Sequence, residues 1–394
     1  MKLPWRRRAD GPGIAGPAGE TVAVYFAEGP ARLYQLEQWL TPLAALAERV
    51  PLAFVLREDA VATALGRAHP ELVAYRCRTL ADLTRLLDGS AVRALLYVNN
   101  AQRNFQALAY RDALHVHVNH GESDKDSVAS NQVKAYDRVL VPGQAGIDRY
   151  TRALIGFDAS KLRAIGRPQL DRVAPAAPPF ATGTTVLYAP TWEGGTRRMD
   201  YSSVAVAGLA IVRTILERTP HNLVYRPHPA TGTASAATRS AHTDVVRLVR
   251  RHPHRAAVDA TPDINALFPH VDFALFDNSA AAVDHLATGK PYGVVDPGLA
   301  RHYPEGLPPF LRDSPRLSVE RVEDLPALIE HALAQGSGPE AARLRPYYLG
   351  VSDGHGTATG RFVAAMLDAV AEAERLIEAR GRMARDDDGY PRQG

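Results

Sequence analysis

Short apolar runs alternate with longer stretches of helical spacing along the first half of the chain. The runs 21–26, 52–56 and 94–98 have the length and composition of buried strands, and the stretches 31–49 and 81–87 have the spacing of helices. This alternation predicts a parallel sheet with helices on both faces. Because such sheets bind ligands at the carboxyl ends of their strands, the polar residues that follow each run are candidates for a site.

The most polar of these strand ends follows the segment His115-Val-His-Val-Asn-His120. We interpret it as a strand that runs into a loop containing His120, Glu122, Asp124 and Lys125. A catalytic base is expected where ionisable groups gather at the end of a strand. Zinc binding is the alternative, since the segment contains three histidines. The sequence offers no further ligand at a standard spacing, so we expect no metal.

The second half of the chain repeats the pattern. Its first predicted elements are, in order, strand 185–189, loop 190–195, helix 203–218, strand 222–226, helix 238–251 and strand 256–258. The strand 222–226 ends in Pro227-His228-Pro229, which is a second polar strand end. Two similar sheets therefore each present a histidine-bearing loop, and a cleft between them is the natural place for a site.

The stretch 263–291 contains a third polar strand end. We interpret it as the end of a helix, a strand at 271–276, the turn Asp277-Asn278-Ser279 and an alanine-rich helix that ends at Gly289. Backbone N–H groups at such a helix start favour a phosphate group. The alternative is an ordinary N-cap, because Asp and Ser cap helices in proteins of every class.

The later part of the chain predicts one more strand at 291–296, a helix at 322–334, an irregular segment at 347–359 and a last long helix from 358. We therefore predict an α/β protein with two Rossmann-like domains that face a cleft. The predicted divisions are a basic, flexible N-terminus 1–20, a first domain 21–173, a proline-containing linker 174–184, a second domain 185–357, a helix 358–382 that packs back on the first domain, and a flexible tail 383–394.

Composition narrows the classes of function. The 394 residues include 46 basic and 43 acidic side chains, so the chain shows no charge excess of the kind that binds nucleic acid. The single cysteine, Cys77, excludes a disulfide framework and suits a reducing cytosol. No apolar window is long enough to span a membrane. The cluster Arg6-Arg7-Arg8 suggests peripheral contact with anionic lipid, and a disordered, soluble N-terminus is the alternative.

Several short motifs, taken in order, resemble those of the CDP-glycerol glycerophosphotransferase family, the polymerases and primases of teichoic-acid synthesis. They are His120-Gly121, Tyr188-Ala-Pro-Thr-Trp192, Arg226-Pro-His228-Pro229, Asp263-Ile-Asn265, Asp277-Asn-Ser279 with Asp284, Gly289-Lys-Pro291, and Asp353-Gly354 followed by Arg361. The resemblance covers roughly residues 110 to 365. It implies a two-domain GT-B fold, with the acceptor on the first domain and the nucleotide donor on the second.

The chain departs from the family pattern at three places. Asn278 and Ala280 stand where the family has a tyrosine and a second serine, so one hydroxyl that would face phosphate is missing. Glu193 follows Trp192 where the family often has a basic residue. After His120-Gly121, the usual small residue and proline are replaced by Glu122-Ser-Asp-Lys.

The resemblance implies transfer of glycerol phosphate, or a similar polyol phosphate, from a CDP-activated donor to a hydroxyl of a cell-wall polymer or lipid-linked acceptor, with no cofactor. It implies a cytoplasmic enzyme, peripheral on the inner face of the membrane where the acceptor is lipid-linked. The implied residues are His120 as general base and His228 as a second catalytic residue, with Arg226, Asn278, Ser279, Asp284, Pro190 and Thr191 binding the donor and its phosphates.

Structural alternatives remain open for each residue. His120 could bond only a turn carbonyl, His228 could serve a rigid proline loop, and Arg226 could pair with a carboxylate. Asp284 could face solvent instead of a ribose hydroxyl, and we expect Trp192 to pack at the domain boundary. Two functional alternatives also remain: a GT-B glycosyltransferase that uses a nucleotide-sugar donor, and a nucleotide-binding relative without catalytic activity.

Overall fold

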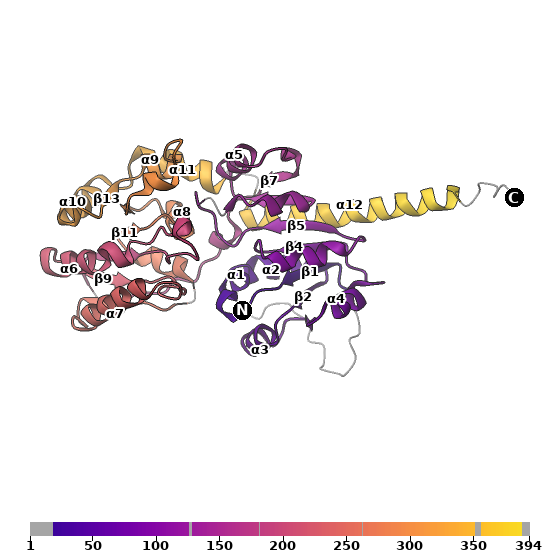
Figure 1. Ribbon diagram of the computed structural model, residues 1–394, viewed down its shortest axis with the longest axis horizontal. Helices are drawn as coiled ribbons and strands as arrows, with labels where there is room; N and C mark the ends of the chain where they lie inside the picture. The colour runs from indigo at the N-terminus through magenta and orange to yellow at the C-terminus, as the bar shows by residue number, and fades with distance from the viewer. Residues whose placement is uncertain (1–18, 126–127, 181, 262, 351–355, 388–394) are drawn as a thin grey trace.

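The structure, a computed structural model, describes residues 19–125, 128–180, 182–261, 263–350 and 356–387. The cluster Arg6-Arg7-Arg8 and the motif Asp353-Gly354 lie outside the described residues. Within the described residues the strands form two separate sheets, and the two bodies built on them lie side by side (Figure 1).

The first sheet, counted over the described residues, has seven strands in the order β3-β2-β1-β4-β5-β6-β7, and all neighbours are parallel. Its strands are short, and most of their residues are buried because helices cover both faces. The strands are β1 (Val22–Phe26), β2 (Leu52–Leu56), β3 (Ala74–Arg76), β4 (Ala94–Tyr97), β5 (Leu114–Val118), β6 (Arg138–Val141) and β7 (Leu162–Ala164).

The second sheet repeats this topology with six strands in the described part of the chain, in the order β10-β9-β8-β11-β12-β13, again all parallel. In both sheets the strand order reverses beside the first strand, which is the Rossmann arrangement and opens a crevice at the carboxyl ends. The strands are β8 (Thr185–Ala189), β9 (Asn222–Tyr225), β10 (Ala256–Val258), β11 (Phe273–Phe276), β12 (Tyr292–Asp296) and β13 (Arg316–Ser318). The predicted fold class is confirmed.

Helices cover the faces of both sheets. Those of the first body are α1 (Tyr34–Glu37), α2 (Leu40–Ala47), α3 (Asp59–Ala68), α4 (Leu80–Leu87) and α5 (Gln144–Ala153). Those that follow β8 are α6 (Leu209–Arg218), α7 (Ala236–Arg250), α8 (Ala280–His285), α9 (Pro309–Asp313), α10 (Leu325–Gln335), α11 (Gly338–Leu349) and α12 (Ala358–Asp387). A π-helical turn, Val204–Gly208, precedes α6.

Three predicted segments differ from the structure. The expected helix 31–49 is broken into a 3-10 turn, α1 and α2, because Pro42 has no N–H to bond the carbonyl of Gln38 and its ring crowds that carbonyl. The segment expected to be irregular from 347 begins as the last turn of α11. The last helix continues to Asp387, past the expected end at 382.

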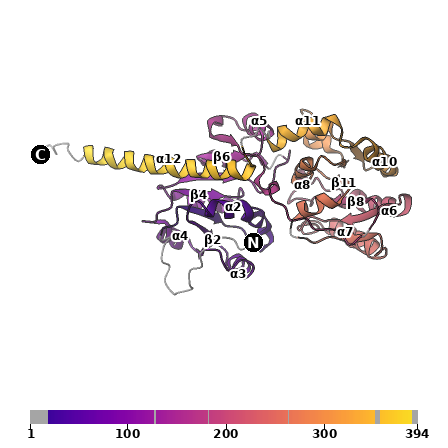
Figure 2. The same cartoon turned by 180° about the vertical axis from the view of Figure 1, so that it is seen from behind.

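The helix α12 starts near the second body and runs along the first, as both views show (Figures 1 and 2). Phe362, Val363 and Met366 on this helix belong to the same buried cluster as Val22 and Val24 of β1. The ring of Phe362 lies 5.2 Å from that of Trp39. The C-terminal helix is thus part of the core of the first body. No helix in the described ranges combines the length and apolar character that crossing a bilayer requires.

Candidate active site

A cavity of about 410 Å³ lies between the two bodies, at the carboxyl ends of both sheets. Its walls come from the loops after β1, β4 and β5 on one side and after β8, β9 and β11 on the other. The predicted site residues that line it are His120, Pro190, Thr191, Arg226, His228, Ser279 and Asp284. Seven residues from four separate strand ends therefore meet in one cavity.

Asn278 is the predicted site residue that does not line the cavity. Its side chain is fully buried, and its amide donates to the hydroxyl of Tyr303 over 2.7 Å. Ser279, the next residue, lines the cavity, and its hydroxyl accepts from the backbone N–H of Ala282 as the N-cap of α8. The polar turn therefore divides its side chains between the core and the cavity.

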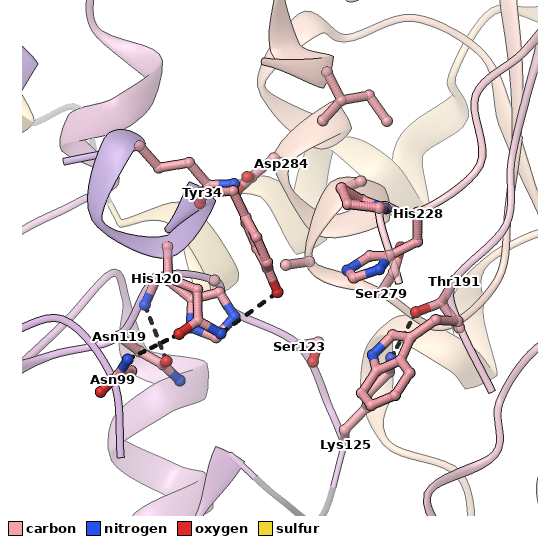
Figure 3. A pocket seen from close by; sticks show the side chains of 18 of the residues that line it. Tyr34, Asn99, Asn119, His120, Ser123, Lys125, Thr191, His228, Ser279 and Asp284 are labelled. Atoms are coloured by element: carbon pink, nitrogen blue, oxygen red, sulfur yellow. Dashed lines mark hydrogen bonds between the residues drawn. The ribbon is translucent and has the colours of Figure 1, made fainter. Parts of the chain in front are cut away.

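The two predicted catalytic histidines face each other across the ring of Tyr34 (Figure 3). The Tyr34 ring stands edge-on to both, with its centroid 6.0 Å from that of His120 and 5.7 Å from that of His228. His120 follows β5 of the first body and His228 follows β9 of the second. Tyr34 is the first residue of α1, and no local pattern in the sequence marks it.

Both histidines are held neutral. Burial, with the nearby cations Arg167, Arg32 and Lys125, lowers the pKa of His120 to about 3. The same kind of environment lowers the pKa of His228 to about 3. The Nδ1 atom of His120 is buried and has no hydrogen-bond partner among the described residues. A neutral imidazole with a free nitrogen is the form that accepts a proton.

The neutral tautomer of His228 follows from its contacts. Its Nδ1 accepts a hydrogen bond from the backbone N–H of Ala230 over 3.1 Å, so Nδ1 carries no proton. The proton of the neutral ring is therefore on Nε2. His228 consequently presents a hydrogen-bond donor, whereas the Nδ1 of His120 has no hydrogen-bond partner among the described residues.

Trp192 lies in the cavity wall, where it does more than pack at the domain boundary. Its ring stacks on His228 with centroids 6.1 Å apart, and the Arg32 guanidinium lies 5.2 Å from the Trp192 ring centroid. Arg32 comes from the loop after β1 and Trp192 from the loop after β8. This cation–π contact joins the two bodies beside the histidines.

Lys125 reaches across the cavity from the loop after β5. Its Nζ donates to the Thr191 hydroxyl over 2.9 Å (Figure 3). The same Nζ lies 5.3 Å from the ring centroid of Tyr201. Burial lowers the pKa of Lys125 to about 8, although the carboxylates of Asp277 and Asp200 act in the opposite direction. Lys125 therefore brings a poorly solvated positive charge to the cavity.

Thr191 is fixed by the buried carboxylate of Asp277. That carboxylate accepts from the backbone N–H groups of Thr191 over 2.9 Å and Ser203 over 3.0 Å. Asp277 is completely buried and lies outside the cavity lining, and burial raises its pKa to about 7. Its role in this geometry is to hold the loop after β8 against the start of the helix that follows it.

Arg226 pairs with a nearby carboxylate, as one alternative anticipated. Its Nε lies 3.3 Å from the Asp259 carboxylate, and its Nη2 donates to the carbonyl of Thr261. Arg226 also lines the cavity and is close enough to His228 to lower that residue's pKa. The cation is thus anchored from behind and contributes positive potential to the cavity.

Asp284 forms a buried ion pair rather than facing solvent. Arg167 donates from Nε to Oδ1 over 2.8 Å and from Nη2 to Oδ2 over 3.1 Å. Arg167 Nη2 also donates to the backbone carbonyl of His120 over 2.9 Å. Asp284 still borders the cavity, but its acceptor atoms are engaged by Arg167.

Glu193 and Ala280, two of the residues that depart from the family pattern, each lie at a defined local contact. The Glu193 carboxylate accepts from the backbone N–H groups of Gly232, Ala234 and Ser235 and so ties the loop after β8 to the loop that follows β9. A Cβ atom at Gly121 would lie 2.6 Å from the Cβ of Ala280, so the two bodies touch at this point.

The other histidines of the segment 115–120 are engaged in the core. His115 Nδ1 is 2.8 Å from the Tyr97 hydroxyl, and the ring of His117 stacks on Tyr136 with centroids 4.9 Å apart. Among the described residues, no three His, Cys, Asp or Glu side chains are gathered so that they could hold a metal ion.

The cavity also contains residues that sequence patterns did not assign. Arg32, Tyr34 and Arg167 come from segments with no recognisable motif, so only the folded chain brings them together. Lys125 stands in the polar loop after β5, and its place among the ionisable residues that follow the strand is the signal that could have assigned it to the site.

A comparison with family models finds the family described as CDP-glycerol:poly(glycerophosphate) glycerophosphotransferase, which matches residues 104–300. This match covers half of the chain and includes both histidine-bearing strand ends and Asp277-Asn278-Ser279. A comparison with curated proteins finds no significant match.

Solved structures with the same fold include the wall teichoic acid polymerase TagF, at 13% identity and a TM-score of 0.53 over 89% of each chain. A UDP-GlcNAc 2-epimerase from Neisseria meningitidis bound to UDP-GlcNAc has 12% identity and a TM-score of 0.56, over 88% of this chain and 100% of that one. A glycosyltransferase from Rickettsia africae has 10% identity and a TM-score of 0.52, over 90% and 98%.

At these identities the structures establish the GT-B fold alone, while the family match covers the motifs at the cavity. The chain belongs to the CDP-glycerol:poly(glycerophosphate) glycerophosphotransferase family.

Proposed function

We propose that the protein transfers glycerol phosphate, or a similar polyol phosphate, from a CDP-activated donor to a hydroxyl group of a cell-wall polymer or a lipid-linked acceptor. CMP is the second product. Family membership supports the transferase class. A solved structure of a TagF variant, a protein of the same fold, was obtained after a soak with CDPG.

One observation carries the proposal: His120 and His228, both neutral, lie on opposite sides of the Tyr34 ring in one cavity. His120 has a buried nitrogen without a partner, and the Nε2 of His228 carries a proton that it can donate. The cations Lys125 and Arg226 border the same space. A base, a donor and positive charge in one cavity are what transfer of a phosphoryl group to an alcohol requires.

The proposed reaction is a direct displacement at phosphorus. The acceptor oxygen forms a bond to the phosphorus that carries the polyol, and the bond from that phosphorus to the bridging oxygen of CMP breaks. The proton of the acceptor hydroxyl goes to His120. CMP leaves with the bonding electrons, and the charge that develops on its phosphate is met by His228 Nε2–H, Lys125 and Arg226.

The remaining predicted residues act in binding and positioning. In this proposal the Ser279 hydroxyl and the loop Pro190-Thr191 contact the donor phosphates, because they border the cavity beside Lys125. Asp284 and Asn278 position their neighbours through Arg167 and Tyr303 instead of contacting the donor. Charge neutralisation is assigned to side chains of the chain, and the proposal includes no cofactor.

We also propose that the reaction takes place in the cytoplasm, and at the inner face of the membrane where the acceptor is lipid-linked. The lone, buried Cys77 is in keeping with a reducing compartment. The basic cluster Arg6-Arg7-Arg8 would supply the contact with anionic lipid, with each basic residue near the surface contributing about 1 kcal/mol.

The test is release of CMP from CDP-glycerol by the purified protein, with and without a hydroxyl acceptor. We expect acceptor-dependent CMP release that is lost by at least about a hundredfold in His120→Ala and His228→Ala. Thr233→Ala, which removes an exposed hydroxyl outside the cavity, is the control and should retain activity.

The same assay separates the alternatives. Consumption of a nucleoside-diphosphate sugar with release of a nucleoside diphosphate, and no CMP from CDP-glycerol, would identify a glycosyltransferase. Binding of CDP-glycerol without turnover of either donor would identify a relative without catalytic activity.

A further inference from the structure

The ring of Tyr34 occupies the space between the two histidines to which the proposed reaction assigns the base and the leaving group. It stands edge-on to both, with its centroid 6.0 Å from that of His120 and 5.7 Å from that of His228 (Figure 3). These are distances of direct edge-to-face contact between rings. The phosphorus and the acceptor oxygen of the proposed reaction have to lie between the same two histidines, so the Tyr34 ring stands in their place.

The Nδ1 atom of His120 is closed off in this arrangement. It is buried and has no hydrogen-bond partner among the described residues. A general base has to come within hydrogen-bond reach of the proton that it removes, and a buried atom offers no surface for this. Access to Nδ1 therefore requires a neighbour of His120 to move. Tyr34 lies against the His120 ring and borders the cavity, so it has open space beside it.

The Tyr34 side chain is held in place by weak polar contacts. Over the described ranges its hydroxyl has a single hydrogen bond, which it accepts from Gln35 Nε2 over 3.4 Å. This distance is at the long end for a hydrogen bond. Gln35 itself is buried, and its Oε1 accepts from Asn99 Nδ2 over 2.8 Å. The backbone at the start of α1 is thus anchored, while the half-buried Tyr34 ring can turn about its own side-chain bonds.

The short segment that contains Tyr34 reaches across to the second body at two points. The Arg32 guanidinium lies 5.2 Å from the Trp192 ring centroid, and Trp192 stacks on His228. Two residues later, Tyr34 contacts His228 itself. His228 is the residue that we place at the leaving phosphate. The Tyr34 ring therefore separates the donor side of the cavity from His120 on the first body.

We propose that the Tyr34 ring is a barrier that an acceptor alcohol displaces and a water molecule does not, so that Tyr34 makes the enzyme select alcohols over water. An alcohol with a large bound portion replaces the two ring contacts with contacts of its own. A water molecule makes too few contacts to do so. The inference rests on the proposed function, and it names the residue that keeps the bound donor from hydrolysis.

Without the barrier, water takes the place of the acceptor in the same displacement. The water oxygen forms a bond to the phosphorus that carries the polyol, and the bond from that phosphorus to the bridging oxygen of CMP breaks. One proton of the water goes to His120, and CMP leaves with the bonding electrons. The products are CMP and the free polyol phosphate.

The experiment measures CMP release from CDP-glycerol in the absence of any acceptor, so its result does not depend on which alcohol the enzyme uses. We expect Tyr34→Ala to release CMP at least about tenfold faster than the wild type. In water labelled with oxygen-18, the label should enter glycerol phosphate and not CMP. Tyr34→Ala combined with His120→Ala should lose the gain, because the hydrolysis uses the same base.

Tyr34→Phe keeps the ring and should hydrolyse CDP-glycerol almost as slowly as the wild type. Tyr34→Leu, which removes the ring but keeps apolar bulk, should also release CMP faster and serves if Tyr34→Ala does not fold. Tyr110→Ala is the matched control, since it removes a half-buried tyrosine that bonds Ser90 outside the cavity. A merely structural role for Tyr34 would slow the reaction and would not raise hydrolysis.

Two results would overturn the inference and leave the proposed function to be decided by acceptor-dependent transfer. One is equal hydrolysis of bound CDP-glycerol by the wild type, Tyr34→Ala and Tyr34→Leu. The other is a gain in Tyr34→Phe as large as in Tyr34→Ala, because the ring would then not be the barrier. A wild-type protein that does not bind CDP-glycerol in calorimetry would overturn both the inference and the proposed function.

Discussion

Arg167 and Asp284 form a buried, two-point ion pair that joins the two bodies of the molecule. The side chains are each 5% exposed, and Arg167 also donates to the carbonyl of His120. The pair therefore fixes the start of the His120 loop relative to α8. A residue expected to bind ribose instead helps to set the distance between the base and the donor side of the cavity.

Replacing either partner of this pair should lower the stability of the folded protein. Arg167→Met leaves Asp284 as a buried, unpaired carboxylate, and we expect the free energy of unfolding to fall by about 3–5 kcal/mol. Arg167→Met combined with Asp284→Leu removes both charges, so its loss should be smaller than the sum of the single losses. Denaturant unfolding of the wild type, Arg167→Met, Asp284→Leu and the double variant tests this prediction. Additive losses of unfolding free energy would contradict it.

The contact between Gly121 and Ala280 gives a second prediction. A Cβ at position 121 would lie 2.6 Å from the Ala280 Cβ, so Gly121→Ala must move the His120 loop away from α8. A shift of about 1 Å in a catalytic group can cost about a hundredfold, so we expect kcat/KM to fall about 10- to 100-fold. Ala280→Gly in the same protein restores the space and should recover most of the rate.

The control for this pair is Gly66→Ala. Gly66 is in α3, and a Cβ there would meet no atom within 4 Å. We expect a gain in stability of about 0.5–1 kcal/mol and no change in activity. If Gly121→Ala kept full activity, or if Ala280→Gly gave no rescue, the close approach would not be a requirement of the active arrangement.

Titration of Lys125 should make kcat/KM for CDP-glycerol fall at alkaline pH. Burial lowers its pKa to about 8, so its positive charge is present below that pH and is lost as the pH rises through it. We expect kcat/KM for CDP-glycerol to decline above about pH 8, since this parameter reports the free enzyme. Lys125→Arg keeps the charge at all these pH values and should remove the limb.

Lys125→Met should lower kcat/KM at pH 7 by about 10- to 100-fold, the worth of a charge-assisted hydrogen bond to phosphate. Lys134→Met is the matched control, because Lys134 bonds the carbonyl of Ile155 on the surface and lies outside the cavity. An alkaline limb that persists unchanged in Lys125→Arg would assign the titration to another group.

The sequence supported the prediction of the two sheets and of most strand ends for a simple reason. Buried parallel strands are short apolar runs, and the residues after them are contiguous, so His120 and His228 could be recognised without knowing the tertiary structure. The break in the expected helix 31–49 could also have been predicted from the sequence, because Pro42 has no N–H group to donate to the carbonyl of Gln38. Local chemistry determines both features.

Other features depend on contacts that no local pattern encodes. Tyr34 lies between the histidines only because α1 packs at the end of β5, and Arg167 finds Asp284 only when the two bodies meet. Within the turn 277–279 the side-chain directions were not predictable either. Asn278 bonds Tyr303 and Asp277 bonds Thr191, and these partners are fixed by the fold.

His285 provides a prediction about stability. Its ring is completely buried among Phe268, Phe276 and Tyr292, and burial lowers its pKa to about 3. In the unfolded chain the pKa of histidine is about 6.5, so the folded state favours the neutral ring. Its contribution to stability is fully present above about pH 6.5, and it falls as the pH drops toward 3, because the unfolded chain then binds a proton that the folded chain does not.

His285→Phe should therefore make the pH dependence of unfolding shallower. Between about pH 6 and 4.5 we expect the slope of the unfolding free energy to differ from that of the wild type by one proton, about 1.4 kcal/mol per pH unit. Above about pH 7 the two slopes should coincide. Phe268→Leu, a substitution in the same cluster that removes no titrating group, should lower stability by a similar amount at every pH. Denaturant titrations across this range provide the measurement, and equal slopes for His285→Phe and the wild type would mean that the buried ring takes up its proton in the folded state as well.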